Sequence, residues 1–123
     1  MQWGAMCALD AIASADPEMI YKNLPALVAA MDAGSVITKD RGMSILTKLC
    51  SAGKHYSDTF PLVLEQLAHS AANQLPMYAE MVLPVAQPED KTKLARVLIS
   101  RLEDLDKESK RKRVEKVVQK LTK

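Results

Sequence analysis

Few residues of this chain have a type and spacing that could support chemistry. His55 and His69 lie at opposite ends of one expected helix, and neither has a partner at metal-ligand spacing. No histidine is placed by the local sequence to activate the Cys50 thiol as a nucleophile. The four glycines are isolated, so a glycine-rich phosphate-binding loop is missing. We therefore expect no catalytic residues, no metal and no cofactor, and predict that the chain is not an enzyme.

The composition favours one all-α domain covering residues 1–123. Of these residues 48% are hydrophobic, but only 4% are aromatic, which is typical of helices that pack through small aliphatic contacts. Cys7 and Cys50 are too few and too far apart to indicate a disulfide framework, and we expect two buried thiols in a reducing cytosol. Ala13-Ser14-Ala15 resembles a signal-cleavage site, but a basic start is lacking and Asp10 interrupts the apolar segment. The predicted location is cytoplasmic, without a membrane partner.

Paired apolar residues recur at one phase along the chain, about every 36 or 37 residues. This period predicts helical hairpins that bury their apolar stripes against copies of themselves. The four pairs are Leu9 and Ile12, Leu46 and Leu49, Val82 and Val85, and Val118 and Leu121. Seven helices are predicted, over residues 2–14, 17–32, 36–52, 57–69, 73–86, 89–105 and 108–122.

Helix-capping residues stand at several of these boundaries. Asp16 precedes Pro17 as an N-cap, Ser35 is suited to the same role, and Gly53 occupies a C-cap position. Asp106 is placed to cap the last helix. Pro25 and Pro61 fall one turn inside their helices at equivalent repeat positions, which indicates either a kink or a helix start at the preceding residue.

The hairpin pattern resembles the HEAT-repeat family of armadillo-like α-solenoids, including bacterial HEAT-repeat proteins of undefined role. The resemblance implies a right-handed α-α superhelix of about 3.5 helical hairpins. The first helix of a unit is visible as Leu24-Pro25-Ala26-Leu27-Val28. The second-helix pattern is visible as Thr38-Lys39, Gly42, Ile45-Leu46 and Leu49, and again as Lys110-Arg111, Val114, Val117-Val118 and Leu121.

The charge is unevenly distributed along the chain. Residues 1–86 hold five Lys or Arg against eight Asp or Glu, whereas residues 87–123 hold twelve against seven. The basic excess lies in the last predicted helix, which has no aromatic residue for base stacking. We interpret this helix as a polar outer face of the array, and keep open a site for an anionic partner.

In HEAT-like solenoids the second helices line a concave surface that binds partners, and the resemblance implies the same surface here. The function that we predict is a protein-protein interaction scaffold or adaptor. The alternative is binding of a nucleic-acid backbone through the basic last helix, as in HEAT-like DNA glycosylases. Trp3 either covers the open end of the array, where self-association is also possible, or belongs to an interaction surface. The candidate partner-binding residues are Gln2, Trp3, Lys39, Asp40, Arg111 and Lys112.

Overall fold

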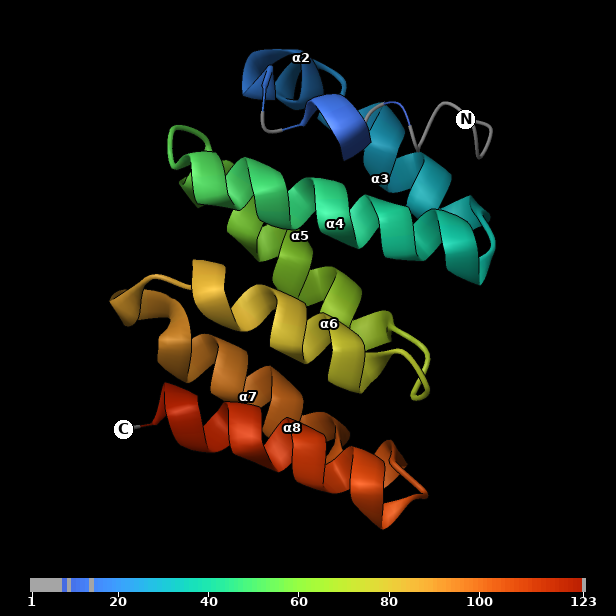
Figure 1. Cartoon of the computed structure of the whole chain (residues 1–123), viewed down its shortest axis with the longest axis vertical. Helices are drawn as coiled ribbons and strands as arrows, with labels where there is room; N and C mark the ends of the chain where they lie inside the picture. The colour runs from blue at the N-terminus through green and yellow to red at the C-terminus, as the bar shows by residue number, and fades with distance from the viewer. Residues whose placement is uncertain (1–7, 9, 14, 123) are drawn as a thin grey trace. The chain divides into compact units, whose positions relative to one another are not determined.

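The computed structural model describes residues 8, 10–13 and 15–122 (Figure 1). Within these residues the chain is almost entirely helical and contains no strand. The predicted all-α class is therefore confirmed. Contacts divide the chain into two compact units, Met1–Phe60 and Pro61–Lys123, and each is described in turn.

The first unit is built around the longest helix, α4 (Val36–Ala52). Both α2 (Pro17–Lys22) and α3 (Leu24–Ala33) pack against α4. Helix α5 (Tyr56–His69) begins in this unit and continues into the second. The helix predicted over residues 36–52 is confirmed with both of its ends. The buried residues of α4 are Thr38, Gly42, Met43, Ile45, Leu46, Thr47, Leu49 and Cys50.

The single helix predicted over residues 17–32 is wrong, because the chain forms two helices there. Asn23 ends α2, and its backbone N–H donates to the carbonyl of Ile20 at 3.1 Å. Pro25 then stands in the first turn of α3. In a continuous helix its ring would clash with the carbonyl of Tyr21, four residues earlier. The helix start at the residue before Pro25, one of the two predicted outcomes, is what the structure adopts.

Three predicted caps of the first unit are confirmed. The Asp16 carboxylate accepts from the backbone N–H of Met19 at 3.2 Å. The Ser35 hydroxyl accepts from the N–H of Thr38 at 3.5 Å, at the start of α4. Gly53 ends α4 with φ of 86°, a left-handed conformation that costs glycine far less than other residues. These local signals therefore set the bounds of α2 and α4.

The second unit places α8 (Glu108–Leu121) against α6 (Leu75–Val82) and α7 (Lys91–Arg101). Short 3-10 turns extend these helices: η1 (Leu83–Val85) follows α6, while η2 (Pro88–Asp90) and η3 (Leu102–Asp104) flank α7. The helices predicted over 73–86 and 89–105 are thus shorter as α-helices. Pro84 stands within η1, where it cannot donate the hydrogen bond that would continue α6.

Asp106 does not cap the last helix, so that prediction is wrong. Helix α8 begins after Lys107, and the Lys107 side chain makes no capping hydrogen bond.

Pro61 lies inside α5, as the sequence predicts for a proline one turn into the helix.

The predicted aliphatic positions are buried in the central helices. Leu46 and Val82 have no exposed surface. Val118 is only half-buried, because the inward face of α8 is centred on Val114, Val117 and Leu121 and leaves Val118 at its edge. Leu9, the fourth member of this set, lies outside the described residues together with Cys7. The burial predicted for these apolar positions is therefore confirmed at Leu46 and Val82 and is only partial at Val118.

Gly42 allows α3 and α4 to approach closely. A Cβ atom at this position would overlap the side chain of Met31, which is completely buried. We predict that Gly42→Ala lowers the free energy of unfolding by about 1–3 kcal/mol, since overpacking forces a buried side chain from its place. Urea unfolding measures the change.

A double-mutant cycle provides the control for this prediction. In a Met31→Ala background the overlap is absent, so Gly42→Ala should cost much less than in the natural sequence. An equal cost in both backgrounds would show that the overlap with Met31 isn't the cause.

Candidate functional site

A buried carboxylate anchors the first polar cluster, although the sequence analysis assigned it no role. Asp10 is 5% exposed and accepts hydrogen bonds from three side chains of α4. The donors are Arg41 Nη1 at 3.1 Å, Ser44 Oγ at 2.7 Å and Lys48 Nζ at 2.9 Å. Burial raises the pKa of Asp10, but the hydrogen bonds from Ser44, Lys48 and Arg41 outweigh it, so the pKa lies below its usual value. The cluster ties residue 10 to the middle of α4.

A second cluster joins α2 to the turn before α5. The Glu18 carboxylate contacts Lys54 Nζ at 2.8 Å and His55 Nε2 at 2.7 Å. Tyr21 stacks on the His55 ring, with centroids 3.6 Å apart, and its hydroxyl donates to Asp58 at 2.8 Å. The hydrogen bonds from Lys54 and His55 lower the pKa of Glu18, whereas the hydrogen bond to Asp58 raises the pKa of Tyr21.

This second cluster contains groups that enzymes use, and these groups are bonded to one another. The ring nitrogen His55 Nε2 is already bonded to Glu18, and the Tyr21 hydroxyl is bonded to Asp58. Cys50, the candidate thiol, is buried, and burial raises its pKa to about 12. At neutral pH that thiol is protonated and weakly nucleophilic. The arrangement holds α2 to the segment at the start of α5.

Arg101 forms the third cluster, within the second unit. Its guanidinium donates to the carbonyls of Leu67 at 2.8 Å and of Ser70 at 2.7 Å, and it pairs with Asp104 at 2.6 Å. These two carbonyls lie at the C-terminal end of α5, where backbone acceptors have no partner within the helix. One planar side chain at the end of α7 therefore satisfies the exposed end of α5.

Two further contacts connect α8 with the segment around α6. Arg113 Nε donates to Glu80 Oε2 at 3.2 Å, and Lys110 Nζ donates to Asn73 Oδ1. The residues in these pairs are 33 and 37 positions apart. The separations in the Asp10, Glu18, Tyr21 and Arg101 contacts run from 31 to 38. The long-range polar contacts within each unit thus join residues about one sequence repeat apart.

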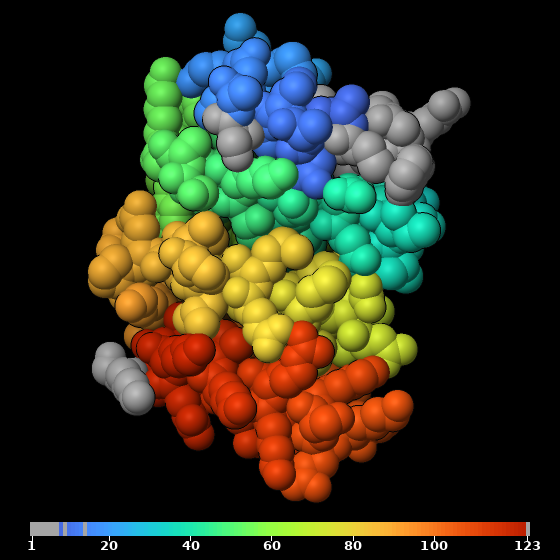
Figure 2. Space-filling model, viewed as in Figure 1, coloured from blue at the N-terminus to red at the C-terminus, as the bar shows by residue number. Residues whose placement is uncertain are grey.

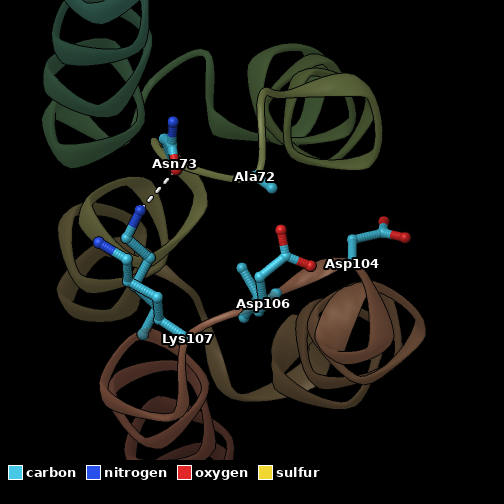
Figure 3. A pocket seen from close by; sticks show the side chains of 7 residues that line it. Ala72, Asn73, Asp104, Asp106 and Lys107 are labelled. Atoms are coloured by element: carbon cyan, nitrogen blue, oxygen red, sulfur yellow. Dashed lines mark hydrogen bonds between the residues drawn. The ribbon is translucent and has the colours of Figure 1, made fainter.

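A small pocket of about 80 Å³ opens beside the start of α8 (Figure 3). Asp104, Asp106 and Lys107 lie across it from Ala72 and Asn73. Its carboxylates and ammonium groups carry opposite charges, and Asp104 is already paired with Arg101. The pocket has room for a few water molecules and a mixture of charges that selects neither an anion nor a cation.

The predicted partner-binding residues lie in different parts of the chain. Lys39 and Asp40 are half-buried on the first half of α4, in the first unit. Arg111 and Lys112 are exposed on α8, where Arg111 donates to the carbonyl of Leu105 and Lys112 pairs with Glu108. Gln2 and Trp3 lie outside the described residues. The single surface expected from the family resemblance stays a prediction.

Across residues 8, 10–13 and 15–122, no group of three or more His, Cys, Asp or Glu could hold a metal ion. In the same part of the chain, every helix is too short or too polar to cross a lipid bilayer.

Comparisons with protein-family models, with curated proteins and with solved structures gave no match to this chain. The likeness to HEAT repeats therefore rests on the sequence pattern.

The Asp10 cluster predicts a pH-dependent contribution to stability. We expect Asp10→Asn to cost about 1–3 kcal/mol at about pH 7, since three donors of α4 lose a charged and buried acceptor. The pKa of Asp10 is lowered on folding. Its contribution is therefore fully present above the ordinary carboxyl pKa and disappears as the pH falls through the lower, folded value. The difference in free energy of unfolding between the natural protein and Asp10→Asn should therefore be smaller at about pH 3 than at about pH 7. Urea unfolding at both pH values measures it.

Asp106→Asn serves as the control, because Asp106 is exposed. It should change stability by less than about 0.5 kcal/mol at either pH. If Asp10→Asn lowers the free energy of unfolding by the same amount at both pH values, the electrostatic explanation is contradicted.

From the Arg101 cluster we predict that the planar geometry of the guanidinium contributes more to stability than its positive charge does. Arg101→Ala should lower the free energy of unfolding by about 2–3 kcal/mol, because the α5 carbonyls lose a charged donor. Arg101→Lys should recover less than half of this loss, since an ammonium cannot span the same acceptors. Thermal and urea unfolding measure both, and Arg96→Ala, at an exposed position of α7, should be almost neutral.

Proposed function

We propose that the chain is a short HEAT-type α-solenoid that binds another protein and performs no catalysis. The observation that carries this proposal is the sequence separation between polar side chains and the residues to which they are hydrogen-bonded. In the described part of each unit, side chains such as Asp10, Glu18, Lys110 and Arg113 form hydrogen bonds with residues 31 to 38 positions away. Such contacts are expected when consecutive hairpins stack on one another.

The second-type helices supply the binding side in this proposal. Helix α4 keeps Val36 and Ile37 about half exposed in its first turn, beside Lys39 and Asp40. Apolar side chains surrounded by polar ones are typical of protein-binding surfaces. A solenoid can vary the exposed positions of such a helix without changing its core.

A cytoplasmic location belongs to the same proposal. Cys50 is present as a free, buried thiol, which is compatible with a reducing compartment.

Nucleic-acid binding through α8 is the alternative that the basic composition suggests. Two of its cations already have acidic partners within the unit, since Arg113 pairs with Glu80 and Lys112 with Glu108. Neutralised cations contribute less to attraction of a phosphate backbone. This observation favours the protein-binding reading.

Site-specific photocrosslinking tests the proposal. A photoreactive amino acid would replace Lys39 or Lys112 in the full chain, and irradiation in a lysate of the source cells should produce discrete protein adducts. Ser51 on α4 and Ser100 on α7 are exposed and serve as matched positions outside the predicted surface. Adducts at all four positions alike, or at none, would contradict the proposal.

A gel-shift titration addresses the alternative separately. We expect no shift of a DNA or RNA oligonucleotide at about 50 mM salt. A shift that decreases steeply as salt rises would favour nucleic-acid binding instead.

A further inference from the structure

The exposed sides of α6 and α8 form one continuous surface of the second unit. The two helices pack against each other and lie side by side (Figures 1 and 2). Exposed residues on α6 and η1 follow the spacing of one helix face, and so do exposed cations on α8. We call this the α6–α8 surface, and define it by Met77, Glu80, Pro84, Arg113, Lys116 and Lys120.

Its charges are unbalanced. Glu80 pairs with Arg113, and this hydrogen bond lowers the pKa of Glu80 below its usual value. Lys116 and Lys120 are exposed three and seven positions after Arg113, on the same face of α8. Three cations thus face one carboxylate, which leaves an excess of two positive charges. An anionic partner would gain from this excess.

The surface also contains apolar atoms on both sides of Glu80. Met77 is 37% exposed one turn before Glu80, and Pro84 is exposed one turn after it. A methionine side chain is flexible and polarizable, so it adapts to the shape of apolar side chains on a partner. An aliphatic or aromatic residue that contacts Met77 would lie next to the cations of α8.

A nucleic-acid backbone fits this surface less well than a protein segment does. The Glu80 carboxylate lies among the cations and would repel a continuous row of phosphates. The surface has no aromatic side chain on which bases could stack. Acidic side chains on a protein, in contrast, can be spaced so that they reach Lys116 and Lys120 and avoid Glu80.

We propose that the α6–α8 surface binds an acidic segment of a partner protein, whose carboxylates pair with Lys116 and Lys120 while an apolar side chain contacts Met77. This inference rests on the proposed function, and adds to it the chemical class of the partner and the residues that select it.

Fluorescence anisotropy with defined probes tests the proposal on the full chain. The first probe is a labelled helical peptide of about 16 residues, with leucines on one face and glutamates beside them. The second is the same peptide with lysine in place of glutamate, and the third is single-stranded DNA of about 20 nucleotides. We expect the acidic peptide to bind more tightly than either of the others, and to lose affinity as salt increases from about 50 to 500 mM.

Charge-reversal variants localise the binding. Lys116→Glu with Lys120→Glu should weaken binding of the acidic peptide by about tenfold or more. Lys93→Glu with Arg96→Glu makes the same change in net charge at exposed positions of α7, and should alter the affinity by less than about twofold. Met77→Asp should also weaken binding, because it removes the apolar contact and adds a like charge. Circular dichroism checks that each variant is folded.

The possible outcomes separate this inference from the proposed function. Equal weakening by both double variants, or no binding of the acidic peptide, would overturn the acidic-partner proposal. If photocrosslinked adducts nevertheless form at Lys39 or Lys112, protein binding stands and only the class of partner is wrong. Tighter binding of DNA, lost in the Lys116 and Lys120 variant, would overturn both in favour of nucleic-acid binding.

Discussion

The helices of this chain are too short to be stable alone in water, so each depends on burial of its apolar face against helices of its own unit. Helix α2 has 6 residues and even α4, the longest, has 17. In the first unit α4 packs against both α2 and α3, and in the second unit α8 packs against both α6 and α7. The completely buried residues Leu46 and Val82 mark where this burial is deepest. Stability therefore comes from packing between helices more than from the propensity of any one helix.

Polar contacts set the register of that packing. Aliphatic side chains are weakly directional, so burial alone doesn't determine how far one helix slides along another. Hydrogen bonds are directional, and Asp10 satisfies three donors of α4 only in one register. Arg101 has the same effect on α5 and α7, because its guanidinium must reach particular carbonyls. Both side chains are largely withdrawn from water, where a lost partner is costly.

The polar groups of these clusters are occupied within each unit, whereas other side chains stay exposed. Among the exposed residues are aliphatic ones such as Ile37 and Met77 and several lysines along α8. In the proposed function, side chains of this kind recognise another protein by shape and charge.

The sequence by itself determined the helical class and several helix ends, because these depend on local chemistry. Apolar periodicity located α4, and Ser35 and Gly53 marked its bounds. The same reasoning gave the helix start before Pro25 as one of two outcomes and misplaced Asp106 as a cap, since backbone angles decide whether a proline begins a helix and whether a side chain reaches the capping position. Asp10 and Arg101 could not be recognised as anchors, although an acid in an apolar segment and an arginine between Leu98 and Leu102 were visible signals. Only the tertiary structure brings each of them to partners more than thirty residues away, because a hydrogen bond requires a distance that sequence spacing does not specify.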